Sequence, residues 1–206
     1  MDTLGILFGN EAKVKLLRLF LFNETIPFDF DDISERADIK IKDLKKELGF
    51  LLKMGCIKKR PFSKEFIARK KGKELKITKK VNGWMYDQSF LYGESLRHLF
   101  SLATISTHDD MAKRMATVGR VKFLVVAGVF IQNTESRVDL LIVGDGLNLK
   151  RLESLVKMIE AEIGREINYS SFETQDFMYR LGLYDKLIRD ILDFPHKTLI
   201  NKLGIE

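Results

Sequence analysis

The residues with the clearest chemical potential lie in one stretch, VKFLVVAGVFIQNTESRVDLLIVGD, residues 121–145. Two apolar runs, Phe123–Ala127 and Val138–Val143, flank a polar connection, and their length and β-branched content predict two strands buried on both faces. Gly128 ends the first strand, where the absence of a Cβ lets other atoms approach closely. Asp139 falls inside the second predicted strand. Because a bare buried carboxylate is costly, it must bind a metal, pair with a nearby arginine or accept hydrogen bonds from backbone N–H groups.

This stretch resembles the minimal form of the nucleotidyltransferase fold, the DNA polymerase β-like superfamily. Members of that family carry Gly-Ser after one strand and Asp-hydrophobic-Asp on the next. The resemblance implies that the Gly-Ser pair holds nucleotide phosphates and that the carboxylates hold Mg²⁺. GREINYSSFETQDF, Gly164–Phe177, resembles the segment with the third strand and the following helix. The resemblance covers Thr117–Glu206.

The chain departs from this pattern where the chemistry needs it. The Gly-Ser pair reads Gly128-Val129, which removes the hydroxyl that binds phosphate. The two carboxylates read Arg137-Val138-Asp139, so a cation replaces the first of them. Asn168 stands about where a third carboxylate is expected, with Glu166 two residues before it. Two-metal phosphoryl transfer needs several converging carboxylates, and Arg137 would repel Mg²⁺.

The resemblance therefore implies the fold and argues against the activity. We expect a pseudoenzyme with no catalytic residue, no metal site and no cofactor, and Mg²⁺ only if the enzyme alternative holds. Because side chains two apart on a strand leave the same face, Arg137 and Asp139 can pair with each other, and Arg137 could instead attract a phosphate. The candidate ligand-binding residues are Gly128, Arg137 and Asp139.

The N-terminal part carries a second pattern, a basic helix followed by a basic hairpin. Apolar spacing predicts a short helix, Ile33–Ala37, a tight turn, and a longer helix, Lys40–Met54. The inward residues of the longer helix are expected to be Ile41, Leu44, Leu48, Leu51 and Leu52. The pattern of residues 56–87 predicts two strands joined by a turn at Lys70–Lys73. Residues 53–80 contain twelve Lys or Arg against two Glu.

Residues 10–87 resemble the winged helix-turn-helix family. The resemblance implies that the second helix enters the major groove of DNA and that the hairpin reaches phosphate or the minor groove. The competing interpretation is that a Lys-rich hairpin is a solvated edge that resists aggregation; a helix and a hairpin that are basic together favour nucleic acid. The candidate DNA-binding residues are Lys42, Lys45, Lys46, Lys53, Lys58, Lys59, Arg60, Arg69, Lys70, Lys71 and Lys73.

Charge divides the chain in the same way. Residues 1–83 hold 20 Lys or Arg and 12 Asp or Glu, a net charge of +8, whereas residues 84–206 hold 15 and 17, a net charge of −2. We expect an α+β protein of two domains: an N-terminal winged helix-turn-helix and a small C-terminal α/β nucleotidyltransferase-like sheet with flanking helices. The expected bounds are 1–90 for the DNA-binding domain, 91–118 for a helical connector and 119–206 for the nucleotidyltransferase-like domain.

Other classes of protein fit the composition poorly. Three scattered His and one Cys make no metal-ligand pattern. The lone Cys56 is expected to be a small buried residue at the start of a strand, and its failure to form an internal disulfide fits a reducing cytoplasm. No run of 18 apolar residues exists, and the N-terminus lacks the pattern of a signal peptide. We expect a cytoplasmic protein without a membrane partner.

The favoured function is a DNA-binding transcriptional regulator. It would bind double-stranded DNA as a homodimer, because recognition by such modules usually uses two half-sites. The C-terminal domain would serve dimerisation, partner binding or ligand sensing, with a nucleotide or a protein as its partner. Two alternatives remain open: an active Mg-dependent nucleotidyltransferase that uses Asp139 with Glu166 or Asp145, and an antitoxin-like protein-interaction module.

Overall fold

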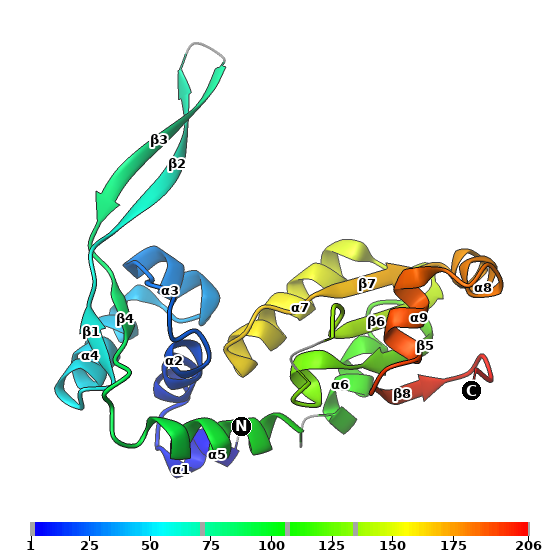
Figure 1. The fold of residues 1–206 in the computed structure, drawn as a ribbon, viewed down its shortest axis with the longest axis horizontal. Coiled ribbons are helices and arrows are strands. Elements are labelled where there is room, and N and C mark those ends of the chain that lie inside the picture. The colour runs from blue at the N-terminus through cyan, green and yellow to red at the C-terminus, as the bar shows by residue number, and fades with distance from the viewer. Residues whose placement is uncertain (1–2, 71–72, 106–107, 134–135, 206) are drawn as a thin grey trace. The chain divides into compact units, whose positions relative to one another are not determined.

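The computed structural model describes residues 3–70, 73–105, 108–133 and 136–205, with only the backbone at residues 68–70, 73–74, 104–105 and 108–109. These residues form a mixed α+β structure with small sheets (Figure 1), as the sequence predicts. The chain divides into two compact units. The first comprises residues 1–97 and 161–164, and the second comprises residues 98–160 and 165–206. Helix α5, Gly93–Ile105, spans the boundary and lies inside the expected connector.

In the first unit the helices precede the strands. The helices are α1 (Thr3–Leu7), α2 (Glu11–Phe22), α3 (Phe30–Arg36) and α4 (Ile41–Lys53), and the strands are β1 (Ile57–Lys59), β2 (Phe62–Lys70), β3 (Lys73–Val81) and β4 (Trp84–Tyr86). The pairs β1–β4 and β2–β3 are both antiparallel. Phe28, just before α3, bridges to Trp84 of β4 through two backbone hydrogen bonds of 2.9 and 2.8 Å. The hairpin predicted around Lys70–Lys73 is therefore a long ribbon on a small base.

Helix α2 forms the centre of this unit. Its cap is Asn10, whose side chain accepts hydrogen bonds from the backbone of Ala12 and Lys13. The helix packs against α3, α4 and β4. It is buried on more than one face: the exposed fraction is at most 1% for each of Leu16, Leu17, Phe20 and Leu21. The more exposed elements, among them the lysine-rich α4, lie around this helix.

Helix α3 begins earlier than the sequence predicts, at Phe30 and not at Ile33. The reason is a capping box one turn upstream. The carboxylate of Asp29 accepts from the backbone N–H of Asp32 at 2.8 Å, and the carboxylate of Asp32 accepts from the N–H of Asp29 at 3.2 Å. Two carboxylates are thereby fixed at the N-terminus of α3.

The bounds predicted for α4 agree with the structure to one residue at each end, but the predicted inward face is partly wrong. Leu44, Leu48 and Leu51 are buried, whereas Ile41 is 54% exposed and Leu52 is half-buried. Glu47 takes a buried place instead and accepts a hydrogen bond of 2.8 Å from the Asn10 side chain. Periodicity assigns a face to a helix, but it does not say where along the helix the covering element ends.

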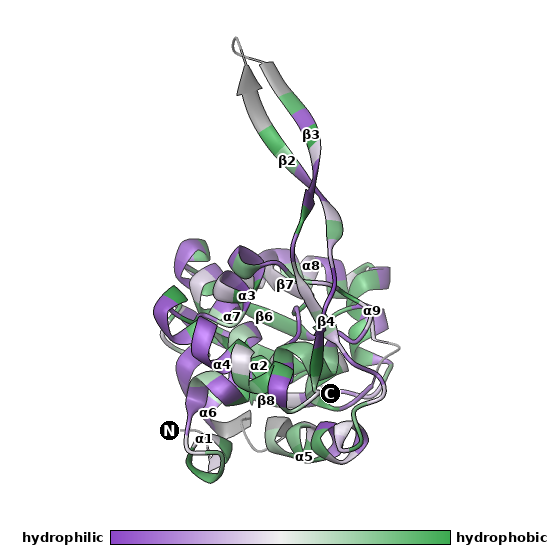
Figure 2. Cartoon of the chain, turned by 90° about the vertical axis from the view of Figure 1, so that its left-hand side faces the viewer, coloured by the Kyte–Doolittle hydropathy of each residue, from purple (hydrophilic) through white to green (hydrophobic). Residues whose placement is uncertain are grey.

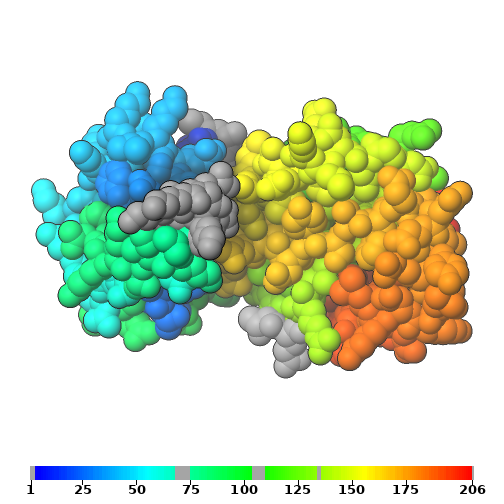
Figure 3. Space-filling model, turned by 90° about the horizontal axis from the view of Figure 1, so that it is seen from above, coloured from blue at the N-terminus to red at the C-terminus, as the bar shows by residue number. Residues whose placement is uncertain are grey.

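The second unit is built on one mixed sheet. Its elements are α6 (His108–Met115), β5 (Arg120–Val126), a 3₁₀ turn (Gly128–Phe130), β6 (Leu140–Asp145), α7 (Leu149–Ile163), β7 (Tyr169–Phe172), α8 (Thr174–Gly182), α9 (Lys186–Leu192) and β8 (Lys197–Asn201). The strand order is β7-β6-β5-β8, with β6 and β7 parallel and the other neighbours antiparallel. The parallel pair is connected through α7, as a parallel crossover requires. Helices α7 and α8 are visible on the surface in yellow and orange (Figure 3).

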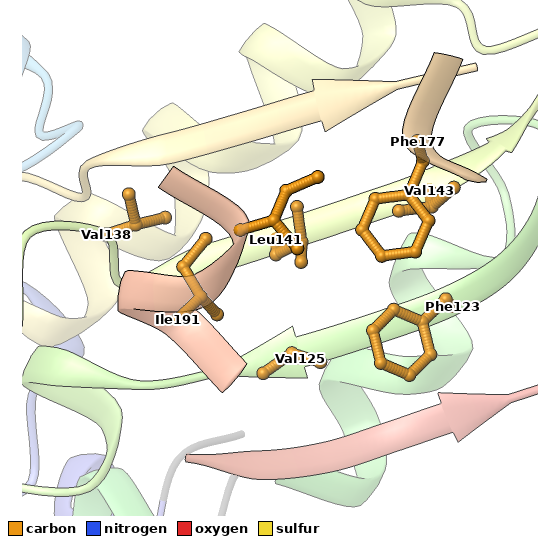
Figure 4. Close-up of a cluster of buried hydrophobic side chains, with 8 residues drawn as sticks. Phe123, Val125, Val138, Leu141, Val143, Phe177 and Ile191 are labelled. Carbon is orange, nitrogen blue, oxygen red and sulfur yellow. The ribbon is translucent and has the colours of Figure 1, made fainter. Parts of the chain in front are cut away.

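One face of this sheet is covered by α8 and α9 (Figure 4). Phe123 of β5 packs against Phe177 of α8 with ring centroids 5.7 Å apart. On the alternate face of the strands, Leu124 and Ile142 are also fully buried. The prediction that both strands are buried on both faces is confirmed.

One detail of that prediction is wrong. Strand β6 begins at Leu140, so Val138 and Asp139 precede it and do not lie inside it. Among the described helices, none combines the length and apolar content needed to cross a lipid bilayer.

Candidate nucleic-acid interface and the Gly128–Asp139 turn

One face of α4 carries a group of exposed cations. Four of the sequence-predicted DNA-binding residues lie on it with exposed side chains, namely Lys42, Lys45, Lys46 and Lys53. None of these four makes an ion pair with any residue that the structure describes. Free ammonium groups on one helix face are suited to contact phosphate oxygens.

Strand β1 and the residue that follows it add three more exposed cations to the first unit. Lys58, Lys59 and Arg60 are exposed. Lys58 pairs with Asp87 at 3.3 Å. The pKa of Asp87 lies below its usual value, mainly because the backbone N–H and hydroxyl of Ser89 donate to it, and also because of Lys58. In the described part of the chain, Lys59 and Arg60 have no such acidic partner.

The predicted residues at the hairpin tip are described less fully. The backbone register places Arg69 opposite Glu74 and Lys70 opposite Lys73. Lys71 lies outside the described residues, as do the side chains of the other three predicted cations. The position of the tip charges therefore follows from the strand register alone.

Sequence reasoning missed the role of Lys64 in β2. Its Nζ lies 2.7 Å from a carboxylate oxygen of Asp29 and 2.7 Å from one of Asp32. Burial by itself lowers the pKa of Lys64, but the two carboxylates outweigh it and raise that pKa above 10.5. Burial likewise raises the pKa of Asp29 on its own, yet the Asp32 N–H and Lys64 bring it below 3.8. This lysine ties the base of the ribbon to the capping box of α3, so it is not one of the free cations.

In the second unit, Asp139 closes the turn after β5. Its Oδ1 accepts from the backbone N–H of Val129 at 2.8 Å, and its Oδ2 accepts from the N–H of Asn168 at 2.9 Å. The residue is 4% exposed. Of the three ways to satisfy this carboxylate, backbone N–H donors are therefore the correct one. Gly128 has a φ of +52°, and a Cβ on it would lie 1.9 Å from Asp139 Oδ1. The prediction that Gly128 permits a close approach is confirmed.

Of the alternatives that the sequence left open for Arg137, pairing with Asp139 is not the one observed. Its guanidinium lies 3.3 Å from Asp190 of α9, and its side chain is 70% exposed. The rule that alternate side chains share a face fails here because residues 137–139 precede β6 and are not part of a strand. The three candidate ligand-binding residues therefore do not form one site: Gly128 and Asp139 are in contact, and Arg137 is directed to α9.

The other two carboxylates considered for metal binding, Asp145 and Glu166, do not form a ligand group with Asp139 among the described residues. Asp145 ends β6, six residues after Asp139, which corresponds to about 20 Å along an extended chain. It pairs with Lys122 at 2.8 Å. Glu166 is exposed in the segment before β7. In the part of the chain that the structure describes, no group of three His, Cys, Asp or Glu could hold a metal ion.

Comparisons with known protein families, with curated proteins and with solved structures found no match to this chain. Two features of the chain itself thus bear on function. One is an exposed array of lysines on α4 and β1, of which Lys58 alone has an acidic partner among the described residues, beside a basic ribbon. The other is a turn in which a buried carboxylate already occupies the backbone N–H donors.

Proposed function

We propose that this protein binds double-stranded DNA through α4 and the β2–β3 ribbon and acts as a transcriptional regulator. The observation that carries the proposal is the row of exposed, unpaired lysines Lys42, Lys45, Lys46 and Lys53 on one face of α4. The order of elements supports it: α2, α3 and α4, then β1 and the ribbon, follow the winged helix-turn-helix arrangement. In that arrangement the last helix lies in the major groove and the hairpin is the wing.

Affinity of this kind is largely electrostatic. Each lysine that neutralises a phosphate releases condensed counterions, so binding weakens as salt rises. The exposed side chains of α4 include no Asn or Gln to read adenine, which favours a large phosphate contribution.

We further propose that the second unit is a catalytically inactive, nucleotidyltransferase-like domain. The succession β5, turn, β6, α7, β7 and its mixed sheet support the likeness. The two N–H donors engaged by Asp139 and the position of Asp145 at the far end of β6 favour a role other than catalysis. Such a role would be dimerisation, partner binding or ligand sensing, and a homodimer would match two DNA half-sites.

A salt titration of duplex binding by the full chain tests the proposal. The variant with Lys42, Lys45, Lys46 and Lys53 changed to Ala should bind all duplexes more weakly. Its salt slope should fall by roughly three to four units, since each phosphate contact contributes about 0.9. The control variant changes Lys113, Lys150, Lys157 and Lys186 to Ala, which removes the same charge from exposed sites of the second unit.

Two results would overturn the proposal. One is that the unaltered chain binds no duplex even at low salt. The other is that the control variant loses as much slope as the α4 variant, because the effect would then reflect net charge and not this helix.

A further inference from the structure

The β2–β3 ribbon carries apolar side chains where a solvated wing would need none. Phe66, Leu75 and Ile77 are 37%, 47% and 40% exposed. Phe66 lies directly opposite Ile77, and Leu75 is two residues before Ile77. Since side chains alternate across a strand, these three leave one face of the ribbon, which we call the apolar ribbon face. Figure 2 shows hydrophobic positions interrupting hydrophilic ones on both strands.

The exposed fractions of these three side chains show that the apolar ribbon face is partly open to solvent. Strands β2 and β3 pair only with each other within the described residues, and they extend as a two-stranded ribbon away from α2, α3 and α4 of the same unit (Figure 1). An isolated two-stranded ribbon is only marginally stable in water. Grouped exposed apolar side chains usually mark a surface that binds something.

Charge identifies the kind of partner. Residues 62–81 contain eight Lys or Arg and two Glu, which is a net charge of +6. Pairing this ribbon with the ribbon of a second copy would place two such charges side by side. A polyanion with apolar walls fits better, because the minor groove of duplex DNA has phosphates along its rims and sugar carbons inside.

We propose that the apolar ribbon face inserts into the minor groove of DNA and bends the duplex. This inference rests on the proposed function, in which α4 occupies the adjacent major groove. The lysine side chains support such an insertion: Lys79 Nζ lies 5.8 Å from the centre of the Phe66 ring, so a cation flanks the apolar surface. Cations placed in this way can neutralise phosphates while the apolar side chains meet the sugar walls.

Bending follows from the dimensions. Nine-residue strands extend about 30 Å, which is long enough to follow a groove. The minor groove of B-DNA is only about 6 Å wide. A ribbon of two strands about 4.8 Å apart, with side chains on both faces, cannot enter without widening it. Proteins that insert apolar side chains in this groove bend the duplex toward the major groove by roughly 20–90°.

Energy transfer between dyes at the two ends of a duplex, mixed with the full chain, measures the bend. The test variant changes Phe66 and Ile77 to Ser. The matched control is Ile67→Ser, because Ile67 is 68% exposed on the opposite face of the same ribbon. The unaltered chain and the control should bend the duplex. The test variant should lose the bend and bind at least about tenfold more weakly, with an unchanged salt slope because no charge is removed.

Several results would overturn the inference and are distinguishable from failure of the proposed function. If the unaltered chain binds a duplex without bending it, or if Ile67→Ser has the same effect as the test variant, the apolar ribbon face does not insert. If the test variant turns a DNA-free dimer into a monomer, a second copy covers the face. If no duplex binds at low salt, both proposals fail. Should the double variant not fold, Leu75→Ser gives the same comparison.

Discussion

Asp139 and Gly128 are in direct contact, and each restricts what the other can be. The carboxylate oxygen occupies the space that a side chain on residue 128 would need, and it bonds to the next backbone N–H, that of Val129. The other carboxylate oxygen accepts from the backbone N–H of Asn168, so Asp139 joins the turn after β5 to the segment before β7.

We predict that Gly128→Ala destabilises the second unit by several kcal/mol. A Cβ would collide with Asp139 and would also strain the positive φ. The control is Gly146→Ala, where φ is +61° but nothing lies within 4 Å of the added carbon. It should cost only about 1–2 kcal/mol. Amide hydrogen exchange in β5 and β6 reports this unit separately from the first. Equal losses of stability in Gly128→Ala and Gly146→Ala would contradict the proposed collision.

We predict that the protein does not transfer nucleotides in a Mg-dependent way. Both oxygens of Asp139 already accept backbone hydrogen bonds, and Asp145 lies at the far end of β6. Calorimetry with ATP, with and without Mg²⁺, provides the measurement. Tight binding that requires Mg²⁺ and disappears in Asp139→Asn would show that this prediction is wrong. Binding that is indifferent to Mg²⁺ but lost in Arg137→Ala would instead support a ligand-sensing role.

Lys64→Met should lower the free energy of unfolding of the first unit by about 2 kcal/mol at neutral pH, because Asp29 and Asp32 lose their shared cation. Fluorescence of Trp84, the single tryptophan, follows unfolding of this unit. The control Lys76→Met removes an exposed pair with Glu65 and should change stability by no more than about 0.5 kcal/mol. If both variants changed stability by the same amount, the ion pairs of Lys64 would not stabilise the contact between the ribbon and α3.

The difference between the unaltered chain and Lys64→Met should also depend on pH. The pKa of Asp29 is depressed, so its contribution is present above its unfolded value of 3.8 and is lost as pH falls through the lower folded value. The pKa of Lys64 is raised, so its contribution is present below 10.5 and is lost as pH rises through the higher folded value. Denaturant unfolding of both proteins, measured at intermediate and at extreme pH, checks this. The full difference in the free energy of unfolding should appear only between these limits.

Cys56 should be inert in the folded protein. It is fully buried, and burial, followed by the negative charge of Asp87, raises its pKa to about 12. Almost no thiolate exists at pH 8, and the thiolate is the reactive form. A chromogenic disulfide reagent should label it slowly in the native state and rapidly in denaturant. Fast native labelling would mean that the start of β1 opens readily.

The sequence by itself determined the features that depend on near neighbours. The apolar spacing of α4, the two strands predicted on either side of the Lys70–Lys73 segment and the β-branched runs of β5 and β6 are local patterns, and each produced the predicted element. It also determined that Gly128 must admit a close neighbour and that Asp139 must have a partner.

Tertiary structure alone decided which partners were chosen. Asp139 bonds to Val129 and Asn168, residues 10 and 29 positions away, and Lys64 bonds to carboxylates 35 and 32 positions before it. Periodicity carries no information about such distant pairs, because they exist only when the chain is folded. For the same reason the sequence misplaced Ile41, and the strand register, not the composition, revealed that the apolar residues of the ribbon share one face.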